Sequence, residues 1–481
     1  MTNLPMTGDL RAHRVSIRVE GIVQGVGFRP FVRNLATALG LAGSVRNDMA
    51  GAFIDVEGLP EAIGTFLSRL ENDAPPLCLI ERIETSPLAP SGGTGFVISP
   101  SDPAGERRAL VPADTATCGD CLAELFDPAD RRYRYPFINC TNCGPRFTIV
   151  RDVPYDRPNT TMAAFGMCAD CEREYADPDD RRYHAQPTCC PACGPVLRLV
   201  DAAGAPIDDR APIDDTDGDG PLEQAAALLR HDKIVAVKGL GGFHLAVRAS
   251  SETAAAALRS RKQREDKPFA VMVLDTTTAR QLCEMDELEQ RLLESPRRPI
   301  VLLARRACSA EPTTGPGIAP SVAPGNRHLG LVLPYTPLHH LLARALGEPF
   351  VLTSGNVSDE PIAFLDDEAR ARLSGIADAF LTHDRPIHMR TDDSVTRALQ
   401  GGATLLRRSR GYVPQPLLLP RALPRSVLAC GAELKNTFCL AQGRRAFVSH
   451  HIGDLENYET LRSFTEGIRH FSRLFDVHPE V

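Results

Sequence analysis

The stretch VEGIVQGVGFRPFVRNLA, residues 19–36, decides the fold of the first part of the chain. Apolar and polar side chains alternate from Arg14 to Glu20, which predicts a half-buried strand, and apolar residues recur at helical spacing after Pro30. A glycine loop therefore joins a strand to the start of a helix. Backbone N–H groups at such a start attract anions, and Arg29 adds a planar fork of donors suited to phosphate. A phosphate site is one interpretation of this loop, and a tight turn with a surface arginine is the other.

The rest of the chain divides into further segments. Residues 14–99 predict the order strand, helix, strand, strand, helix, strand, with the closing strand near GFVISP at residues 95–100. That order fits a ferredoxin-like sandwich. Helices alternate with apolar β-branched runs from residue 222 to about 415, which indicates an α/β domain. A glycine-punctuated hairpin pattern then starts at Val427, and a helical apolar stripe runs from Tyr458 to Phe475.

Composition and charge exclude some classes of protein. The 481 residues are enough for about three domains, and a net charge of -7 argues against a dedicated nucleic-acid or membrane-surface protein. Neither a signal peptide nor an apolar run of membrane length is evident. We therefore expect a cytoplasmic protein. Its fourteen cysteines would stay reduced there, so close-set cysteines are expected to bind metal rather than form disulfides.

Residues 118–145 and 168–195 form an internal repeat at a constant offset of fifty. Each copy carries two Cys-x-x-Cys pairs separated by eighteen residues, and each pair can supply half of a tetrahedral ligand set. We expect two structural zinc ions, because closed sites leave no open coordination position. The expected ligands are Cys118, Cys121, Cys140, Cys143, Cys168, Cys171, Cys190 and Cys193. Cys189 falls outside the pattern, and the spacing leaves open whether pairs share an ion within or across the copies. Dithiol exchange is the weaker alternative.

Two segments of the α/β region suggest a nucleotide pocket. Five cations lie between Arg259 and Lys267, just before an apolar strand, although such a cluster is ordinarily a solvated helix end. Thr353, Ser354 and Asn356 follow another apolar strand at its carboxyl end, where open α/β sheets commonly bind ligands. Neither a dinucleotide fingerprint nor a Walker motif is present, so any phosphate site here has another geometry.

Taken together, these motifs carry a resemblance to a known family. VEGIVQGVGFRP and VRNDMAG resemble the acylphosphatase signature. With the doubled Cys-x-x-Cys block, the motifs RKQREDKPFAVMV, LPYTPLHHLL, LTSGNVSDEP, RTDDSV and RRSRGYVPQP are similar in type and order to the HypF family of hydrogenase maturation carbamoyltransferases. The resemblance implies a multidomain α/β and α+β chain. Its parts would be a ferredoxin-like acylphosphatase domain at 13–103, a double zinc-finger domain with four cysteines per finger at 110–200, a YrdC-like nucleotide-binding domain at 215–415, and the start of an actin/Hsp70-like carbamoyl-transfer domain at 425–481.

The resemblance also implies an activity. Carbamoyl phosphate would be hydrolysed to carbamate, carbamate would be adenylated by ATP with Mg²⁺, and the carbamoyl group would pass to the C-terminal cysteine of the partner protein HypE. Dehydration there supplies the cyanide ligands of the [NiFe] centre. The expected partners are therefore carbamoyl phosphate, ATP and HypE, with neither a membrane nor a nucleic acid among them.

Site residues follow from the same resemblance. It implies that Arg29 and the backbone of the phosphate loop, Gln24, Gly25, Val26, Gly27 and Phe28, cradle the phosphoryl group, while Asn47 orients the attacking water. It implies that nucleotide or carbamate is bound by Lys262, Arg264, Ser354 and Asn356. Lys238 is a weaker candidate with a structural alternative.

Two other functions are compatible with parts of the sequence. YrdC-like domains occur in tRNA-modifying and RNA-binding proteins, and the Arg-Arg-Tyr runs at 131–133 and 181–183 offer cations and aromatic rings to RNA. The acidic net charge and the acylphosphatase-like segment oppose that alternative. A purely structural scaffold, with neither hydrolysis nor ATP exchange, is the third possibility.

The last segment, residues 425–481, resembles only the opening of the carbamoyl-transfer domain and is too short to bury that domain's core alone. His450 stands where the resemblance leads us to expect a glutamine. We expect the chain to be the N-terminal portion of a longer enzyme. Such a portion would hydrolyse carbamoyl phosphate and form carbamoyl adenylate without completing transfer to HypE.

Overall fold

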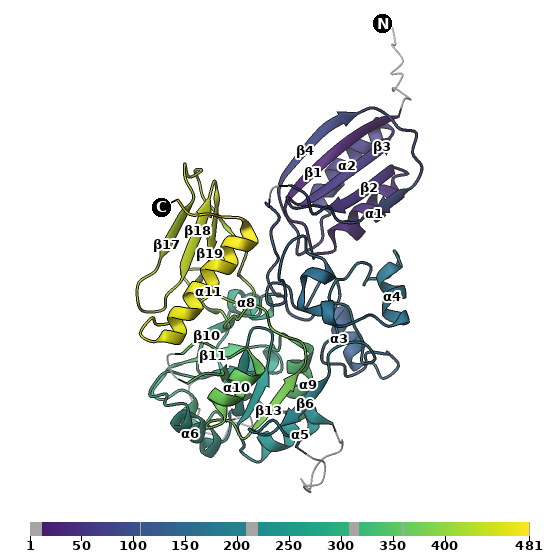
Figure 1. Ribbon diagram of the computed structural model, residues 1–481. Helices are drawn as coiled ribbons and strands as arrows, with labels where there is room; N and C mark the ends of the chain where they lie inside the picture. The colour runs from purple at the N-terminus through teal and green to yellow at the C-terminus, as the bar shows by residue number, and fades with distance from the viewer. Residues whose placement is uncertain (1–11, 106, 208–219, 307–316, 358–359, 481) are drawn as a thin grey trace.

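The computed structural model describes residues 12–105, 107–207, 220–306, 317–357 and 360–480. The chain forms four units in sequence order (Figure 1): an N-terminal unit (13–98), a cysteine-rich unit (109–195), a central unit (197–407) and a C-terminal unit (417–480). The cysteine-rich unit lies between the N-terminal and central units. This arrangement confirms the predicted fold class, a multidomain chain of α/β and α+β units.

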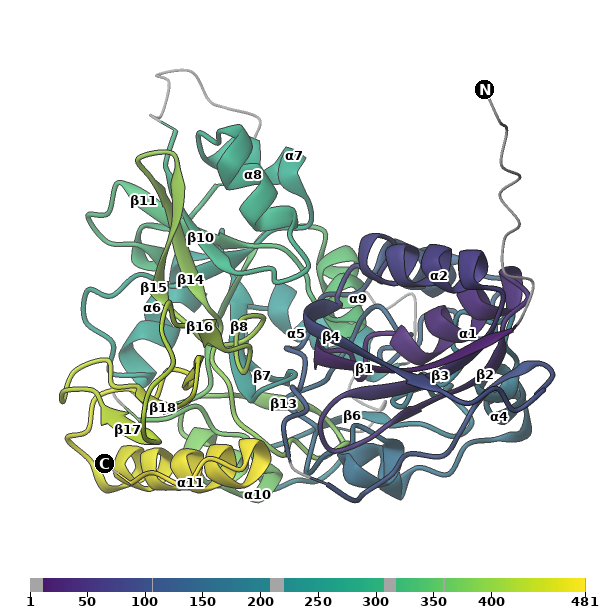
Figure 2. The same ribbon diagram turned by 90° about the horizontal axis from the view of Figure 1, so that it is seen from above.

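The N-terminal unit is a ferredoxin-like sandwich. Its elements are β1 (His13–Ile22), α1 (Phe28–Ala38), β2 (Ala42–Asn47), β3 (Ala52–Gly58), α2 (Pro60–Asn72), β4 (Leu79–Leu88) and β5 (Phe96–Ile98). The sheet has the order β4-β1-β3-β2-β5, and both helices cover one face of it (Figure 2). The predicted closing strand at 95–100 is a fifth strand, parallel to β2. The strand that closes the fold is β4, which pairs with β1. The sequence pattern did not predict β4, because its side chains are mostly exposed.

The cysteine-rich unit consists of two similar halves with little regular structure. Its elements are α3 (Gly119–Phe126), the 3-10 turns η1 (Arg157–Asn159) and η2 (Thr161–Ala164), and α4 (Ala169–Ala176). Arginines are exchanged between the halves. Glu174 of the second half forms salt bridges with Arg131, at 2.6 Å, and with the buried Arg132 of the first half. Glu124 of the first half forms salt bridges with Arg181, at 2.5 Å, and with the buried Arg182 of the second half. Both Arg-Arg-Tyr runs therefore use their cations to hold the two halves together.

The central unit is a mixed ten-stranded sheet with the order β15-β14-β10-β11-β9-β12-β8-β7-β13-β6. Its strands are β6 (Leu197–Val200), β7 (Val235–Lys238), β8 (Phe243–Arg248), β9 (Ala270–Met272), β10 (Ile300–Ala304), β11 (His328–Val332), β12 (Phe350–Ser354), β13 (Ala379–His383), β14 (Val395–Leu399) and β15 (Gly402–Arg407). Its helices are α5 (Pro221–Arg230), α6 (Glu252–Arg261), α7 (Thr276–Leu282), α8 (Glu287–Glu294), the 3-10 turn η3 (Pro320–Val322), α9 (Pro337–Leu346) and α10 (Asp366–Leu373).

Both faces of this sheet are buried. Along β7, Val235 and Val237 belong to one apolar cluster and Ala236 to another, as side-chain alternation in a strand requires. The first cluster continues into α5, α9 and the cysteine-rich unit, and the second into α6, α8 and α10. The sheet is therefore fixed on one side to the cysteine-rich unit.

The C-terminal unit contains β16 (Leu417–Leu418), β17 (Val427–Cys430), β18 (Phe438–Gln442), β19 (Arg445–Val448) and α11 (Tyr458–Phe475). The predicted hairpin and helix are confirmed. Phe475 of α11 stacks on Phe447 with 4.1 Å between ring centroids. This contact belongs to the same apolar cluster as the core of the N-terminal unit, so the short segment is buried with the help of other units.

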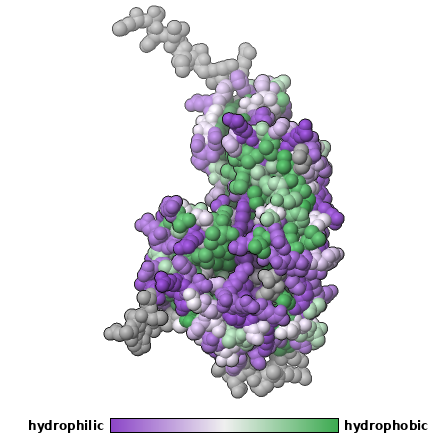
Figure 3. Space-filling model, turned by 90° about the vertical axis from the view of Figure 1, so that its left-hand side faces the viewer, coloured by the Kyte–Doolittle hydropathy of each residue, from purple (hydrophilic) through white to green (hydrophobic). Residues whose placement is uncertain are grey.

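The surface on the C-terminal side is mixed in character. Figure 3 views the molecule from this side and shows patches of hydrophobic surface separated by hydrophilic side chains. Exposed leucines of β15 and β16, such as Leu406 and Leu418, are among the large apolar side chains of the chain that reach solvent. Among the described helices, none has the length and apolar character that crossing a membrane requires.

Candidate functional sites

The loop between β1 and α1 has the geometry of an anion cradle. Gly25 and Gly27 adopt left-handed φ values of 69° and 76°, which glycine reaches without strain. Within the described residues, the backbone N–H groups of residues 24–28 donate no hydrogen bond. Unbonded N–H groups at the start of a helix are suited to phosphate. The loop thus offers donors that the fold itself does not use.

Arg29 lies at the second position of α1 and is only 7% exposed. Its Nη2 donates to Asp156 Oδ1 at 2.9 Å, and its Nη1 donates to Ser101 Oγ at 3.2 Å. The guanidinium is therefore held beside the loop by two residues that come from outside the sandwich.

Asn47 ends β2 and is fully buried, yet within the described residues its side-chain nitrogen and oxygen have no hydrogen-bond partner. Its backbone oxygen accepts a hydrogen bond from Asp102 N at 2.9 Å, one residue from the Ser101 that Arg29 contacts. The linker after β5 thus connects the two predicted catalytic residues. An unsatisfied buried amide is costly, so its free groups are available to a water or ligand.

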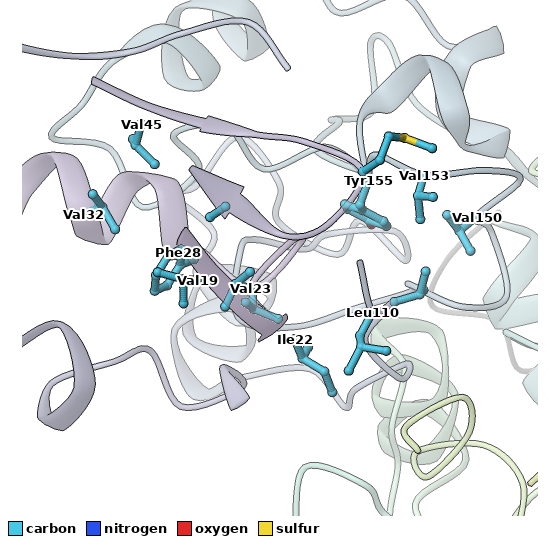
Figure 4. Close-up of a cluster of buried hydrophobic side chains, with 14 of the residues drawn as sticks. Val19, Ile22, Val23, Phe28, Val32, Val45, Leu110, Val150, Val153 and Tyr155 are labelled. Atoms are coloured by element: carbon cyan, nitrogen blue, oxygen red, sulfur yellow. The ribbon is translucent and has the colours of Figure 1, made fainter. Parts of the chain in front are cut away.

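The cysteine-rich unit covers this loop. Arg146 Nε donates to the Gly25 carbonyl at 2.7 Å, and Tyr155 N donates to Gln24 Oε1 at 2.8 Å. A Cβ on Gly25 would lie 2.7 Å from the Tyr155 ring, so only glycine permits this approach. Figure 4 shows Tyr155, Val150, Val153 and Leu110 continuing the apolar cluster formed by Val19, Val23 and Phe28.

A small cavity lies at this boundary, with a volume of about 20 Å³, room for one water. From the loop side it is lined by Gly25, Gly27, Phe28 and Arg29, and from the cysteine-rich unit by Thr141, Arg146, Tyr155, His184 and Gln186. Asn47 does not line it. No local pattern in the sequence signalled these partners, because they lie more than a hundred residues from the loop.

The eight predicted cysteines form two clusters, Cys118, Cys121, Cys140 and Cys143 in one and Cys168, Cys171, Cys190 and Cys193 in the other. In the first cluster Cys143 Sγ lies 3.5 Å from Cys121 Sγ and 3.8 Å from Cys140 Sγ, and all four sulfurs lie within 4.8 Å of one another. Four sulfurs about 2.3 Å from a zinc ion in a tetrahedron stand about 3.8 Å apart, so both clusters fit zinc. Both Cys-x-x-Cys pairs of one repeat copy belong to the same cluster. The spacing left open whether pairs combine within or across the copies, and in the structure they combine within a copy. Cys189 belongs to neither cluster.

A backbone donor at the start of α4 favours a thiolate at Cys168. Cys118 and Cys168 are the N-cap residues of α3 and α4. The pKa of Cys168 falls to about 7, chiefly because its sulfur accepts a hydrogen bond from the Cys171 backbone. Arg131 of the first half also donates to Cys171 Sγ at 3.2 Å, and Arg181 donates to Cys121 Sγ at 3.3 Å. Each cluster is thus stabilised by the opposite half.

The four residues predicted to bind nucleotide line one cavity of about 890 Å³: Lys262, Arg264, Ser354 and Asn356. Lys262 is 1% exposed, and its Nζ donates to the backbone oxygens of Ser354 at 2.9 Å and Asn356 at 2.5 Å. Burial lowers the pKa of Lys262 from 10.5 to about 7. Ser354 Oγ donates to Asn356 Oδ1 at 2.9 Å. Lys262, Ser354 and Asn356 are therefore connected at the carboxyl end of β12, while Arg264 donates to the backbone oxygens of Lys267 and Pro268.

Further polar residues line the same cavity without having been assigned a role from the sequence: His244, Asp392, Asp393, Arg407, Lys435, His451 and Asp454. Asp393 accepts from Arg410 Nε at 2.7 Å, and His244 Nε2 lies 3.3 Å from it. The adjacent acidic residues in RTDDSV, Asp392 and Asp393, were the feature of the sequence from which this part of the cavity could have been predicted. Lys435 and His451 come from the C-terminal unit, which therefore forms part of the wall.

Lys238 lies elsewhere and has a structural role. It is buried in β7, and its Nζ donates to His383 O at 2.8 Å and pairs with Asp366 Oδ1 at 2.7 Å. It does not line the cavity that contains Lys262. The structural alternative considered for this lysine is the one that its contacts support.

Family models match the chain in four places. The Acylphosphatase model matches residues 15–98, and the HypF finger model matches 117–150 and 167–200. The Sua5_yciO_yrdC model, described as telomere recombination, matches 227–409, and the HypF Kae1-like domain model matches 422–481.

Relatives resemble the chain over nearly its whole length. The carbamoyltransferase HypF2 of Cupriavidus necator is 50% identical over 492 residues, covering 98% of this chain and 59% of the relative. HypF of Synechocystis sp. is 47% identical, covering 97% and 59%. A crystal structure of full-length HypF in a phosphate- and nucleotide-bound form is similar with a TM-score of 0.91 at 46% identity, covering 98% of this chain and 60% of that one. The chain thus spans about three fifths of the length of these relatives.

Proposed function

Because the chain belongs to the HypF family of carbamoyltransferases, we propose that it hydrolyses carbamoyl phosphate at Arg29 and activates the resulting carbamate with ATP at Lys262. One observation carries this proposal. A phosphate-type loop with unbonded N–H groups and a cavity lined by the buried Lys262 and by less buried cations occur in one molecule. A relative 46% identical to this chain is described as binding both phosphate and nucleotide.

The hydrolytic step follows from the contacts of the loop. The phosphoryl oxygens of carbamoyl phosphate accept hydrogen bonds from the N–H groups of residues 24–28 and from Arg29. Water held by the free amide of Asn47 attacks phosphorus, the P–O bond to the carbamoyl group breaks, and carbamate and inorganic phosphate leave. Preorganised donors stabilise the negative charge that builds up on the phosphoryl oxygens, and a good leaving group makes a strong base unnecessary.

In the second step a carbamate oxygen attacks the α-phosphorus of ATP, and pyrophosphate leaves. Lys262 and Arg264 supply positive charge to the phosphates, with Mg²⁺ as the accompanying ion. Ser354 and Asn356 orient nucleotide or carbamate by hydrogen bonds. Carbamoyl adenylate is the product of this step.

Replacing Lys262 or Arg264 with alanine is expected to abolish carbamoyl-phosphate-dependent exchange between pyrophosphate and ATP, a loss of about 10²-fold or more, because charge on the phosphates is removed where it builds up. Labelled pyrophosphate measures the exchange. Lys233→Ala, which removes an exposed lysine after α5, is the matched control and should exchange at the wild-type rate. Unchanged exchange in both cavity variants would show that the nucleotide site lies elsewhere.

Binding of Mg-ATP at about pH 8 is expected to draw a proton from the buffer. Lys262 has a pKa of about 7 and is mostly neutral there, while nearby phosphates favour its charged form and raise the pKa on binding. Calorimetric titrations in buffers of different ionisation enthalpy give the number of protons taken up. Lys262→Arg carries a permanent charge and should show no such uptake. Equal uptake in both proteins would assign the proton to another group.

Other features of the family belong to the same proposal. HypE is the proposed acceptor of the carbamoyl group, and two structural zinc ions hold the cysteine-rich unit. A cytoplasmic location would keep the zinc ligands reduced. The RNA-binding alternative is disfavoured, because the arginines of the Arg-Arg-Tyr runs are paired with Glu174 and Glu124.

A further inference from the structure

Asp156 belongs to the cysteine-rich unit but meets the phosphate loop of the N-terminal unit. Its Oδ1 accepts from Arg29 Nη2 at 2.9 Å, and the two side chains are 24% and 8% exposed. Within the described residues, its carboxylate makes no other hydrogen bond or ion pair, and it does not cap the 3-10 turn η1 that it precedes. The only polar contact that this carboxylate makes there is therefore with the arginine assigned to phosphate.

The carboxylate and a bound phosphate would compete for the same donors. Arg29 has a planar fork of N–H groups, of which Nη1 is already engaged by Ser101 and Nη2 by Asp156. A phosphoryl dianion beside Asp156 would be repelled by the negative charge of this carboxylate. The repulsion is weakly screened, because the site is partly buried. The cavity at this boundary holds about one water, so substrate enters only as side chains move.

Neighbouring side chains do not offer Arg29 another anion. His184 lines the same cavity and its pKa is lowered to about 4 by burial, so the ring is neutral near pH 7. Arg146 adds a further cation, whose guanidinium donates to backbone carbonyls on both sides of the boundary. Asp156 is thus the single carboxylate paired with Arg29 in the described part of the chain.

We propose that Asp156 is a built-in competitor for the phosphate site: it holds Arg29 when the cradle is empty, yields it to the substrate, and retakes it to expel inorganic phosphate after hydrolysis. The proposal rests on the proposed function of Arg29. No bond forms or breaks in this exchange, because one anion replaces another on the same guanidinium. It makes the cysteine-rich unit a working part of the acyl phosphate site.

The test is the affinity of the 481-residue chain for inorganic phosphate, measured by calorimetric titration in the presence of zinc. Asp156→Asn should bind phosphate about tenfold more tightly, since a charged competitor becomes a weaker neutral one. Asp152→Asn is the matched control. That carboxylate lies in the same loop and pairs with Arg107 at 2.5 Å, so its loss should leave phosphate affinity unchanged. Equal or weaker binding by Asp156→Asn would overturn the proposal.

Steady-state kinetics give a second test. A purely structural role of Asp156 would not change the inhibition constant of phosphate. In Asp156→Asn the inhibition constant of phosphate and the KM for carbamoyl phosphate should fall together, while kcat falls because product leaves more slowly. A lower kcat with an unchanged inhibition constant would mean that Asp156 only holds Arg29 in place. Asp156→Ser repeats the measurement if the asparagine variant unfolds. Phosphate binding by Arg29→Ala at wild-type affinity would instead refute the proposed site itself.

Discussion

Replacing Arg29 with alanine is expected to lower kcat/KM for carbamoyl phosphate hydrolysis by about 10³-fold. The arginine is the cation that reaches the loop from α1, and its guanidinium would face the phosphoryl oxygens as negative charge accumulates on them. The backbone N–H groups of the loop would remain, so residual hydrolysis above the rate in water is expected. Release of phosphate from carbamoyl phosphate measures the rate, with the spontaneous decay of the substrate subtracted.

A matched variant separates catalysis from folding in this experiment. Arg69→Ala removes an exposed arginine from α2 of the same unit, where it pairs with Asp73, and should keep the wild-type rate. Zinc content and the far-ultraviolet circular dichroism of both variants should equal those of the wild type. Wild-type hydrolysis by Arg29→Ala would show that the phosphate loop is not the hydrolytic site.

Removal of zinc is expected to unfold the cysteine-rich unit. Zinc binding contributes on the order of 10 kcal/mol per ion in isolated fingers. Without metal, four buried or half-buried thiolates in each cluster would repel one another. A strong chelator should therefore release two ions per chain and open residues 117–195 to proteolysis. Since this unit covers the phosphate loop, carbamoyl phosphate hydrolysis should be lost with the metal or change its KM.

Single substitutions assign the ligands in the same assay. Cys121→Ser should lower the zinc content to one ion or fewer, because its sulfur lies 3.5 Å from that of Cys143 in the first cluster. Cys189→Ser should retain two ions, although this thiol is buried and adjacent to the ligand Cys190. Loss of an ion from Cys189→Ser would show that spacing misassigned the ligands.

The features that could be predicted from the sequence are encoded over short distances. Strand alternation, helical spacing and the glycines of the loop each depend on neighbours within a few residues, so the first strand and helix of the sandwich were predictable. Regular Cys-x-x-Cys spacing likewise identified all eight residues of the metal clusters. Lys262 and Ser354 are ninety-two residues apart; a cation cluster and polar residues at the end of a strand suggested one pocket, and only the resemblance singled out these two residues.

What the sequence could not show depends on the packing of distant segments. Tyr155 lies 131 residues from Gln24, to which it donates a hydrogen bond, and no repeat or charge pattern joins them. The same holds for Asp156 and Arg29, at a separation of 127 residues. Strand β4 was missed for a different reason: its exposed, charged side chains have little of the apolar alternation that marks a strand.

The exchange of arginines between the two halves of the cysteine-rich unit gives that unit an internal symmetry like that of a dimer. Arg132 of one half contacts Glu174 of the other, and Arg182 contacts Glu124 in return, which is the isologous pattern of two identical subunits about a two-fold axis. One half in isolation would expose an arginine that is now 1% exposed and leave its glutamate unpaired. The duplication is therefore the smallest self-sufficient form of this finger, and a single copy would need a second copy of itself as its partner.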